Sequence, residues 1–225
     1  MSLPFYVPPE QLMKDRAEFA RKGIARGKSI VAVEYEDGIL LLAENPSGTL
    51  HKISEIYDRI AFAGVGRYNE FETLRVAGIR HADIKGYAYG RPDVNAKGLA
   101  NAYSQTLGNI FTHEIKPYEV EILVVEVGDE PSGNRLFRVL YDGTVYDERR
   151  FCAIGGQAEA LVNRLNERYQ PRLGLHQGVQ VVARVFEELE NRSIPPEEWE
   201  AAILDRSLGR RAFRRLETQE IAAGA

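Results

Sequence analysis

The first apolar pattern along the chain has the period of a helix. In the segment PEQLMKDRAEFARKGIARG, apolar residues recur at steps of three and four: Leu12, Met13, Ala17, Ala20 and Ile24. This spacing predicts an amphipathic helix over about residues 10–26, which begins at Pro9 or Glu10 and has Gly27 just past its end. Residues 1–9 carry no charged side chain and three prolines. We expect an irregular arm there, because proline blocks helical hydrogen bonding.

The pattern then changes to short extended runs, interrupted twice by pairs of helices. A strong hairpin signal, Asp37-Gly38, lies between the runs SIVAVEY and ILLLAEN, and a third strand is expected in RIAFAGVG. Helices are predicted from about Tyr68 to His81 and from about Val94 to Phe111. Three more strand-like runs follow: YEVEILVVEV, RLFRVLYDGTVYD with a turn at Asp142-Gly143, and FCAIGG. Two further helices are expected in AEALVNRLNERY and QGVQVVARVFEELENR, and two strands, WEAAILD and RRAFRRL, close the chain.

This order of elements predicts an α+β fold. Strands that follow one another in hairpins favour antiparallel sheets, and paired helices can cover the outer face of each sheet. We therefore expect a four-layer αββα sandwich with two central antiparallel sheets. The uncharged runs ILLLA and ILVV fit strands that are buried on both faces. No repeat, linker or low-complexity segment divides residues 10–225, so we expect a single domain after an N-terminal arm of residues 1–9.

Composition narrows the classes of function. The 225 residues are 44% hydrophobic and 28% charged, as in an ordinary globular protein, with 29 basic and 33 acidic side chains and a net charge of −4. This mild acidity argues against a dedicated nucleic-acid binder, which needs a basic surface. The longest apolar run, ILLLA, is far shorter than the roughly 20 residues of a membrane-spanning helix. We expect a cytoplasmic protein without a membrane partner.

Few side chains are arranged for chemistry. The four histidines lie far apart without metal-ligand spacing, so no metal site is expected. The single cysteine, Cys152, lies in a predicted strand and is expected to be a buried, inert thiol. Glycine turns at residues 64–66 and 155–156 precede helices; phosphate binding is one interpretation, and tight turns are the favoured one. The arginine cluster in GRRAFRRL suits either an acidic partner or a charged edge strand.

Five segments carry a family resemblance over nearly the whole chain: PPEQLMKDRAEFARKGIARGKSIVA, AENPSGTLHKISEIYDRIAFAGVGRYNEFETLR, KPYEVEILVVEV, LYDGTVYDERRFCAIGG and RRAFRRL. The first two are the most specific, and KPYEV matches the turn pattern [RK]-P-[YF]-x-V. On these motifs the chain resembles proteasome α subunits of the actinobacterial type. That family has the N-terminal-nucleophile αββα sandwich, which agrees with the layer order predicted above.

The resemblance also implies that the chain has no catalytic residue. In catalytic β-type relatives an N-terminal threonine attacks the substrate with its own amine as base, and an acid and a lysine tune it. Matched by motif, the nucleophile's place is Lys28, the acid's is Glu44 and the lysine's is Lys52. An ammonium cannot replace the hydroxyl, and the nitrogen of Ser29 remains an amide. The helix before Lys28 is expected to belong to the folded body rather than to a disposable propeptide.

The resemblance implies instead that the chain builds part of a larger assembly and gates its entrance, and that it needs no cofactor. Such subunits form a heptameric ring of identical chains on a ring of β subunits. A ring-shaped ATPase or another activator docks on them through its C-terminal tails. Activator docking would use Lys52, Gly27 and Arg67, although Arg67 stands where relatives often carry an apolar residue. The inner pore constriction maps to Thr112, His113 and Glu114. The gate would be formed by Ser2, Leu3, Pro4, Phe5, Tyr6, Val7, Pro8 and Pro9.

Other interpretations stay open on the residues alone. Lys52 also fits an exposed or ion-paired lysine, with Glu55 and Asp58 as candidate partners. The leading hypothesis is a non-catalytic α subunit of the bacterial proteasome core. An active self-processing amidohydrolase of the same fold would need a Thr, Ser or Cys after Gly27. A small-molecule-binding or nucleotide-binding sandwich protein would use the glycine turns.

Overall fold

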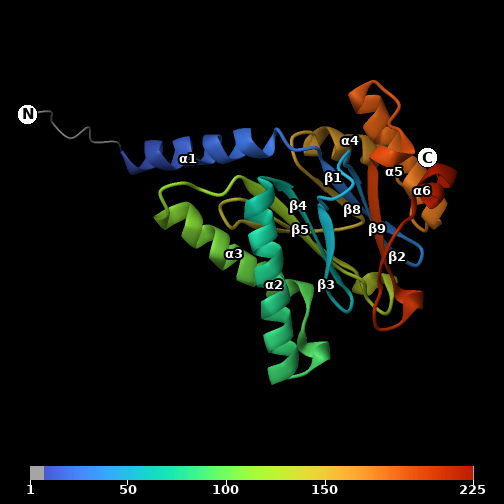
Figure 1. Cartoon of the computed structure of the whole chain (residues 1–225), viewed down its shortest axis with the longest axis horizontal. Coiled ribbons are helices and arrows are strands. Elements are labelled where there is room, and N and C mark those ends of the chain that lie inside the picture. The colour runs from blue at the N-terminus through green and yellow to red at the C-terminus, as the bar shows by residue number, and fades with distance from the viewer. Residues whose placement is uncertain (1–7, 225) are drawn as a thin grey trace, which may run out of the picture.

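Two five-stranded antiparallel sheets lie at the centre of the fold (Figure 1). The computed structural model describes residues 8–224. The first sheet has the order β10 (Phe213–Arg215), β9 (Trp199–Asp205), β2 (Gly38–Glu44), β1 (Ile30–Tyr35) and β8 (Phe151–Ile154). The second has the order β3 (Ile53–Tyr57), β4 (Ile60–Gly66), β5 (Val120–Glu126), β6 (Arg135–Val139) and β7 (Val145–Glu148).

Both predicted hairpins are confirmed. β1 and β2 pair with Tyr35 opposite Gly38, so Glu36 and Asp37 form the turn. A side chain on Gly38 would collide with the carbonyl of Leu204 on the neighbouring strand β9, which requires glycine there. The second hairpin joins β6 to β7, and Gly143 in its turn has a φ of +86°, a conformation that favours glycine.

Helices cover the outer face of each sheet. α2 (Tyr68–Ala88) and α3 (Ala96–His113) pack on the second sheet, whereas α4 (Ala158–Arg168) and α5 (Leu175–Glu190) pack on the first. α6 (Thr218–Gly224) lies against α5, and α1 (Pro9–Ile24) extends beyond the sheets above the end of α3 (Figure 1). Single 3-10 turns lie at Arg91–Asp93, Pro131–Gly133, Pro196–Glu198 and Arg206–Leu208.

Buried apolar side chains fill the three spaces between the four layers of helices and sheets. One lies between the sheets and includes Ile30 and Leu41 from the first sheet and Leu123 from the second. Another joins the first sheet to α4 and α5, and the third joins the second sheet to α2 and α3. Every residue of β2 is buried, because alternate side chains enter different layers. The predicted α+β, αββα sandwich is confirmed.

Several predicted bounds were wrong. α2 continues to Ala88 rather than ending near His81. Strand β3 was missed, because its residues Ser54 and Glu55 are polar and leave no continuous apolar run. The short C-terminal helix α6 was missed as well. α1 ends at Ile24 and α5 begins at Leu175, each two residues before the predicted position.

Of the residues predicted for the gate and the constriction, those that the structure describes lie in or next to helices. Ser2, Leu3, Pro4, Phe5, Tyr6 and Val7 lie outside the described residues. Pro8 is the N-cap of α1, and Pro9 is the first residue of that helix rather than the last of an arm. Thr112 and His113, expected in a loop, are the last two residues of α3, and Glu114 is its C-cap. Within residues 8–224, helices that combine the length and apolar character of a membrane span are absent.

Candidate functional site

Three residues at or next to the ends of separate strands meet at one end of the two sheets. Lys28 lies two residues before β1, Glu44 ends β2 and Lys52 directly precedes β3. The Lys28 ammonium lies 3.1 Å from Glu44 Oε2. The Lys52 ammonium donates to the carbonyl of Glu44 at 3.0 Å and to that of Lys28 at 3.3 Å. The three positions matched by motif therefore form one cluster.

Lys28 is fixed as a cation in this cluster. Besides Glu44, its ammonium contacts Glu190 Oε1 at 3.3 Å, at the end of α5. Burial lowers the pKa of Lys28, but hydrogen bonds and charge interactions with Glu44 and Glu190 outweigh it, so the pKa is raised overall. Glu44 is only 2% exposed, and its other oxygen accepts from Arg192. The amine at the nucleophile's place is therefore held protonated.

Ser29, the nearest hydroxyl, has a structural role. It is buried, and its Oγ accepts a hydrogen bond of 3.2 Å from the backbone N–H of Gln157, the N-cap of α4. Its own nitrogen lies within the continuous chain. Ser29 thus helps to position the start of α4 and offers no free amine beside its hydroxyl.

Lys52 is half-buried and points inward. Burial lowers its pKa, although Glu200 and Glu44 act in the opposite direction. An ammonium has three N–H donors, and two of them are used by the carbonyls of Lys28 and Glu44. The candidate partners Glu55 and Asp58 were wrong, since Glu55 pairs with Arg211 and Asp58 with Arg91.

Gly27 and Arg67 border the same cluster. A Cβ on Gly27 would lie 2.6 Å from Val65 Cγ1 and 3.2 Å from the nitrogen of Gly66. Packing within the chain therefore excludes a side chain at Gly27, without any partner. Arg67 follows β4 as the N-cap of α2, and its Nε lies 3.0 Å from Glu119 Oε1. The three predicted docking residues thus lie at one edge of the sandwich.

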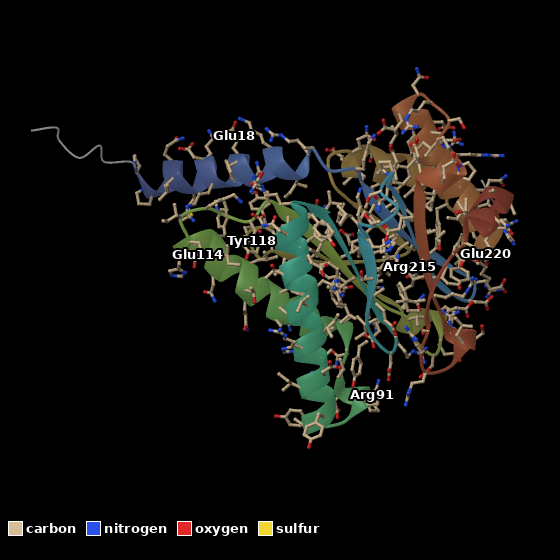
Figure 2. All side chains as sticks on the ribbon, viewed as in Figure 1. Glu18, Arg91, Glu114, Tyr118, Arg215 and Glu220 are labelled. Atoms are coloured by element: carbon tan, nitrogen blue, oxygen red, sulfur yellow. The ribbon has the colours of Figure 1, made fainter. Side chains whose placement is uncertain are left out.

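The end of α3 is attached to this edge and to α1. The Arg16 guanidinium on α1 donates to the carbonyls of Phe111 and Glu114. Figure 2 shows Glu114 at the tip of α3, beneath α1. Lys116, two residues further on, contacts Glu70 Oε1 at 2.6 Å and Glu119 Oε1 at 3.0 Å. The contacts of Arg16 and the pair of Lys116 with Glu70 could not be read from the predicted elements, because the partners are 46 to 98 residues apart in sequence.

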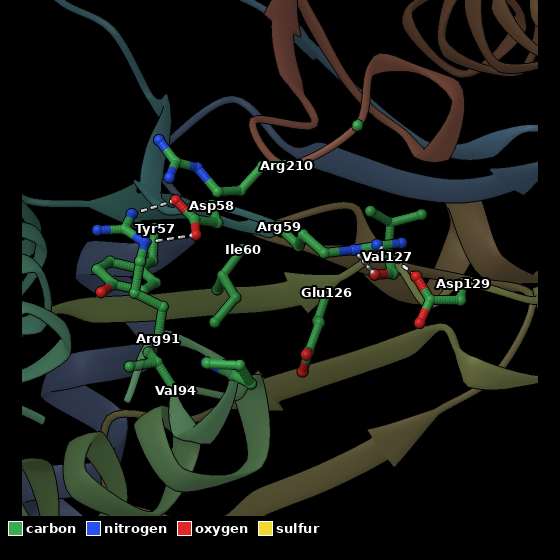
Figure 3. A pocket seen from close by; sticks show the side chains of 13 residues that line it. Tyr57, Asp58, Arg59, Ile60, Arg91, Val94, Glu126, Val127, Asp129 and Arg210 are labelled. Carbon is green, nitrogen blue, oxygen red and sulfur yellow. Dashed lines mark hydrogen bonds and ion pairs between the residues drawn. The ribbon is translucent and has the colours of Figure 1, made fainter. Parts of the chain in front are cut away.

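A cleft of about 410 Å³ lies at the opposite end of the second sheet, where β3 ends (Figure 3). Arg91 forms a two-point ion pair with Asp58, with Nε 2.9 Å from Oδ2, and stacks on the ring of Tyr57. Arg59 likewise pairs with Asp129 at 2.6 Å. Both ion pairs form within the chain, while Arg59 Nη2 is buried without a hydrogen-bond partner. The cleft is separate from the cluster around Lys52.

The remaining candidates have structural explanations. A Cβ on Gly66 would collide with the carbonyl of Glu119, and one on Gly156 would lie 2.6 Å from the carbonyl of Ala25, so close backbone packing accounts for glycine in both turns. Cys152 is buried, and burial raises its pKa, as expected for an inert thiol. Across residues 8–224, groups of three or more His, Cys, Asp or Glu arranged to hold a metal ion are absent.

Three of the four arginines in the cluster form ion pairs within the chain, and two of them, Arg214 and Arg215, lie on the edge strand β10. β10 is at the edge of the first sheet. Arg215 lies 3.0 Å from Glu200 and donates to the carbonyl of Ile53 in the other sheet. Arg214 pairs with Glu220 on α6 at 2.8 Å, and Figure 2 shows Arg215 and Glu220 at this end of the molecule. The cluster therefore fastens β10 to α6 and to the second sheet.

Comparison with known proteins identifies the family. The family model described as "Proteasome subunit" matches residues 24–204. A "Proteasome subunit alpha" of Acidothermus cellulolyticus is 59% identical over 220 residues, which cover 96% of this chain and 94% of the relative. Those of Xylanimonas cellulosilytica and Acidimicrobium ferrooxidans are 55% and 56% identical. They cover 96% and 98% of this chain and 93% and 95% of their own lengths.

Proposed function

Because the chain belongs to the proteasome subunit family and is an α-type member of it, we propose that it is a non-catalytic subunit of a proteasome core particle. It forms the outer, heptameric ring, gates substrate entry with its N-terminal arm and docks activators, while β subunits cleave the substrate. The observation that carries this proposal is the Lys28 ammonium held between Glu44 and Glu190 at the nucleophile's place.

The absence of catalysis follows from what this chemistry requires. A nucleophile of this class needs a hydroxyl or thiol next to a free amine that acts as base. Residues before Lys28 form α1, whose Ala20 and Ile24 are buried in the layer between the sheets. Removing α1 to free an amine would expose part of that layer. The preceding segment is therefore part of the folded body.

Lys52 is suited to receive the terminal carboxylate of an activator. Its third N–H donor is left for a ligand once the carbonyls of Lys28 and Glu44 are served. One charge-assisted bond contributes about 1.5–3 kcal/mol. Docking is therefore weak for a single tail and becomes effective when several tails bind around a ring. The surroundings of the half-buried Lys52 ammonium have a lower dielectric constant than water. Each charge contact is therefore stronger than at a surface lysine.

The gate proposal is supported by the attachment of α1. Pro8 and Pro9 join the arm to α1, and Arg16 fastens that helix to the carbonyls of Phe111 and Glu114. The arm thus starts from a helix held against the proposed constriction at Thr112, His113 and Glu114. Aromatic and proline residues in the arm can cover a pore without burying charges. Exposed Leu12 and Phe19 on α1 offer apolar surface for contacts with neighbouring copies in the ring.

The docking proposal is tested with Lys52→Ala in the assembled complex with β subunits. Stimulation of peptide hydrolysis by an activator should be lost, while ring assembly on native mass spectrometry and unstimulated hydrolysis stay unchanged. Lys97→Ala, at an exposed position on α3, is the matched control. Full stimulation in Lys52→Ala would refute the docking role. Loss of the ring would instead make Lys52 a structural residue.

A further inference from the structure

We propose that Arg67 makes the docking site selective for activator tails that carry an acidic side chain in addition to their terminal carboxylate. This inference rests on the docking function proposed above and adds the chemistry of the partner. In this inference Lys52 binds the terminal carboxylate of the tail. Arg67, at the same edge of the sandwich, binds the acidic side chain.

The guanidinium of Arg67 is only partly used within the chain. Its Nε lies 3.0 Å from Glu119 Oε1, but this buried oxygen receives no well-aligned hydrogen bond. Glu119 Oε1 is also shared with the ammonium of Lys116 at 3.0 Å. A guanidinium has five N–H donors in a planar fork that matches a carboxylate. Arg67 therefore keeps donors for a second carboxylate.

At this edge the acidic groups are buried and the basic groups are exposed. The carboxylates lie beneath the surface, with side-chain exposures of 3% for Glu44, 8% for Glu70 and 9% for Glu119. Their cationic partners face solvent: the exposures are 42% for Lys28, 39% for Lys116 and 57% for Arg67. Each of these cations is more exposed than the carboxylates it pairs with, including Glu190 at 21% beside Lys28. Such a surface attracts anions.

The position of Arg67 is unfavourable for α2 itself. As the N-cap it offers no side-chain hydrogen bond to the helix, and the positive end of the helix dipole disfavours a cation there. Its backbone N–H is bonded to the carbonyl of Glu119 at 3.0 Å, so the residue cannot move away from this place. The ion pair with Glu119 offsets part of this cost, and the donors that Arg67 keeps remain available to a ligand.

The spacing sets where the acidic residue of the tail should lie. The carbonyl of Lys52 accepts from the N–H of Gly64 at 3.0 Å, and Arg67 follows Gly64 by three residues, directly after the end of β4. Three extended residues span at most about 10 Å, so the backbone of Arg67 lies within roughly 10 Å of that of Gly64. We therefore place the acidic residue of an extended tail about three residues before its end.

Two fluorescent octapeptides with free C-termini provide the probe, identical except for Glu or Gln at the third residue before the last. Their binding to the assembled α–β complex is measured by fluorescence polarisation. We expect the Glu peptide to bind about tenfold more tightly than the Gln peptide. In Arg67→Gln this preference should fall below about twofold, and Arg67→Lys should keep part of it. Added salt should reduce the preference in the wild-type complex.

Further arms separate this inference from the docking proposal. A C-terminally amidated Glu peptide and the variant Lys52→Ala should both show strongly weakened binding. If these controls behave as expected but the wild-type complex binds both octapeptides equally, Arg67 does not select an acidic group and the inference is overturned. If neither amidation nor Lys52→Ala matters, the docking proposal itself fails. If an Arg67 variant fails to assemble, equal binding of the Glu and Gln peptides to the wild-type complex still overturns the inference.

Discussion

Replacing Gly27 with alanine should destabilise the fold without any partner present. The new methyl would lie 2.6 Å from Val65 Cγ1, well inside the about 3.5–4.0 Å contact distance between carbon atoms. The nitrogen of Gly66 at 3.2 Å and the carbonyl of Ile24 at 3.3 Å close the other sides, and backbone cannot rotate away. Overpacking of this kind costs about 1–3 kcal/mol. Each kcal/mol lowers the melting temperature of a chain of this size by about 2–4 °C.

A double-mutant cycle with Val65→Ala tests the cause. Val65→Ala alone removes two methyl groups, worth roughly 1.6 kcal/mol of transfer free energy, and leaves a cavity. In the double variant the methyl at position 27 would enter the space that Cγ1 vacates. We therefore expect the double variant to be more stable than the sum of the single changes, by about 1 kcal/mol.

Urea unfolding of the isolated chain measures these free energies. The single tryptophan, Trp199, is buried against Phe186 and reports the transition by fluorescence. Gly48→Ala is the matched control, because no atom lies within 4 Å of its new methyl. Wild-type stability in Gly27→Ala, or strict additivity in the cycle, would refute the packing account. The need for glycine would then have to come from a bound partner chain.

Other changes test separate parts of the structure. Deleting residues 2–8 should speed hydrolysis of small peptides by the assembled α–β complex, and an unchanged rate would remove the gate assignment. Cys152 is 2% exposed and its pKa is raised by burial, so a disulfide reagent at about pH 8 should modify it only after unfolding; rapid modification of the folded chain would contradict this. Glu70→Gln loses the charge that binds Lys116 and the N–H of Glu119, both at 2.6 Å, and should cost about 1.5–3 kcal/mol in urea unfolding. Glu72→Gln, which breaks only an i,i+3 pair with Arg75, should cost about 0.5 kcal/mol or less, and equal losses in the two variants would contradict the difference.

The pattern of apolar residues predicted the strands well where they are buried on both faces. The runs that became β2 and β5 are uncharged over most of their length, and the hairpin turns at Asp37 and Gly143 carry standard signals. β3 was missed because two of its five residues, Ser54 and Glu55, are polar at a partly buried sheet edge. The end of α2 was missed because exposed Tyr87 and the glycines around it give no periodic signal.

The candidate site was predictable only as far as local motifs reach. Motif matching brought Lys28, Glu44 and Lys52 to one place, and the structure brings their atoms together. Arg192, which holds Glu44, is 148 residues away in sequence, and only the three-dimensional packing of α5 on the first sheet places it there. The intramolecular reason for Gly27 was hidden in the same way, since it depends on the contact between the segment that precedes β1 and the end of β4.

Peptide hydrolysis by the purified chain, with and without β subunits, tests the central claim most directly. The account predicts no turnover by the chain alone and clear turnover once β subunits are added. Turnover by the chain alone that survives in Lys28→Ala and is lost in Ser29→Ala would contradict it, because a nucleophile would then exist in this chain.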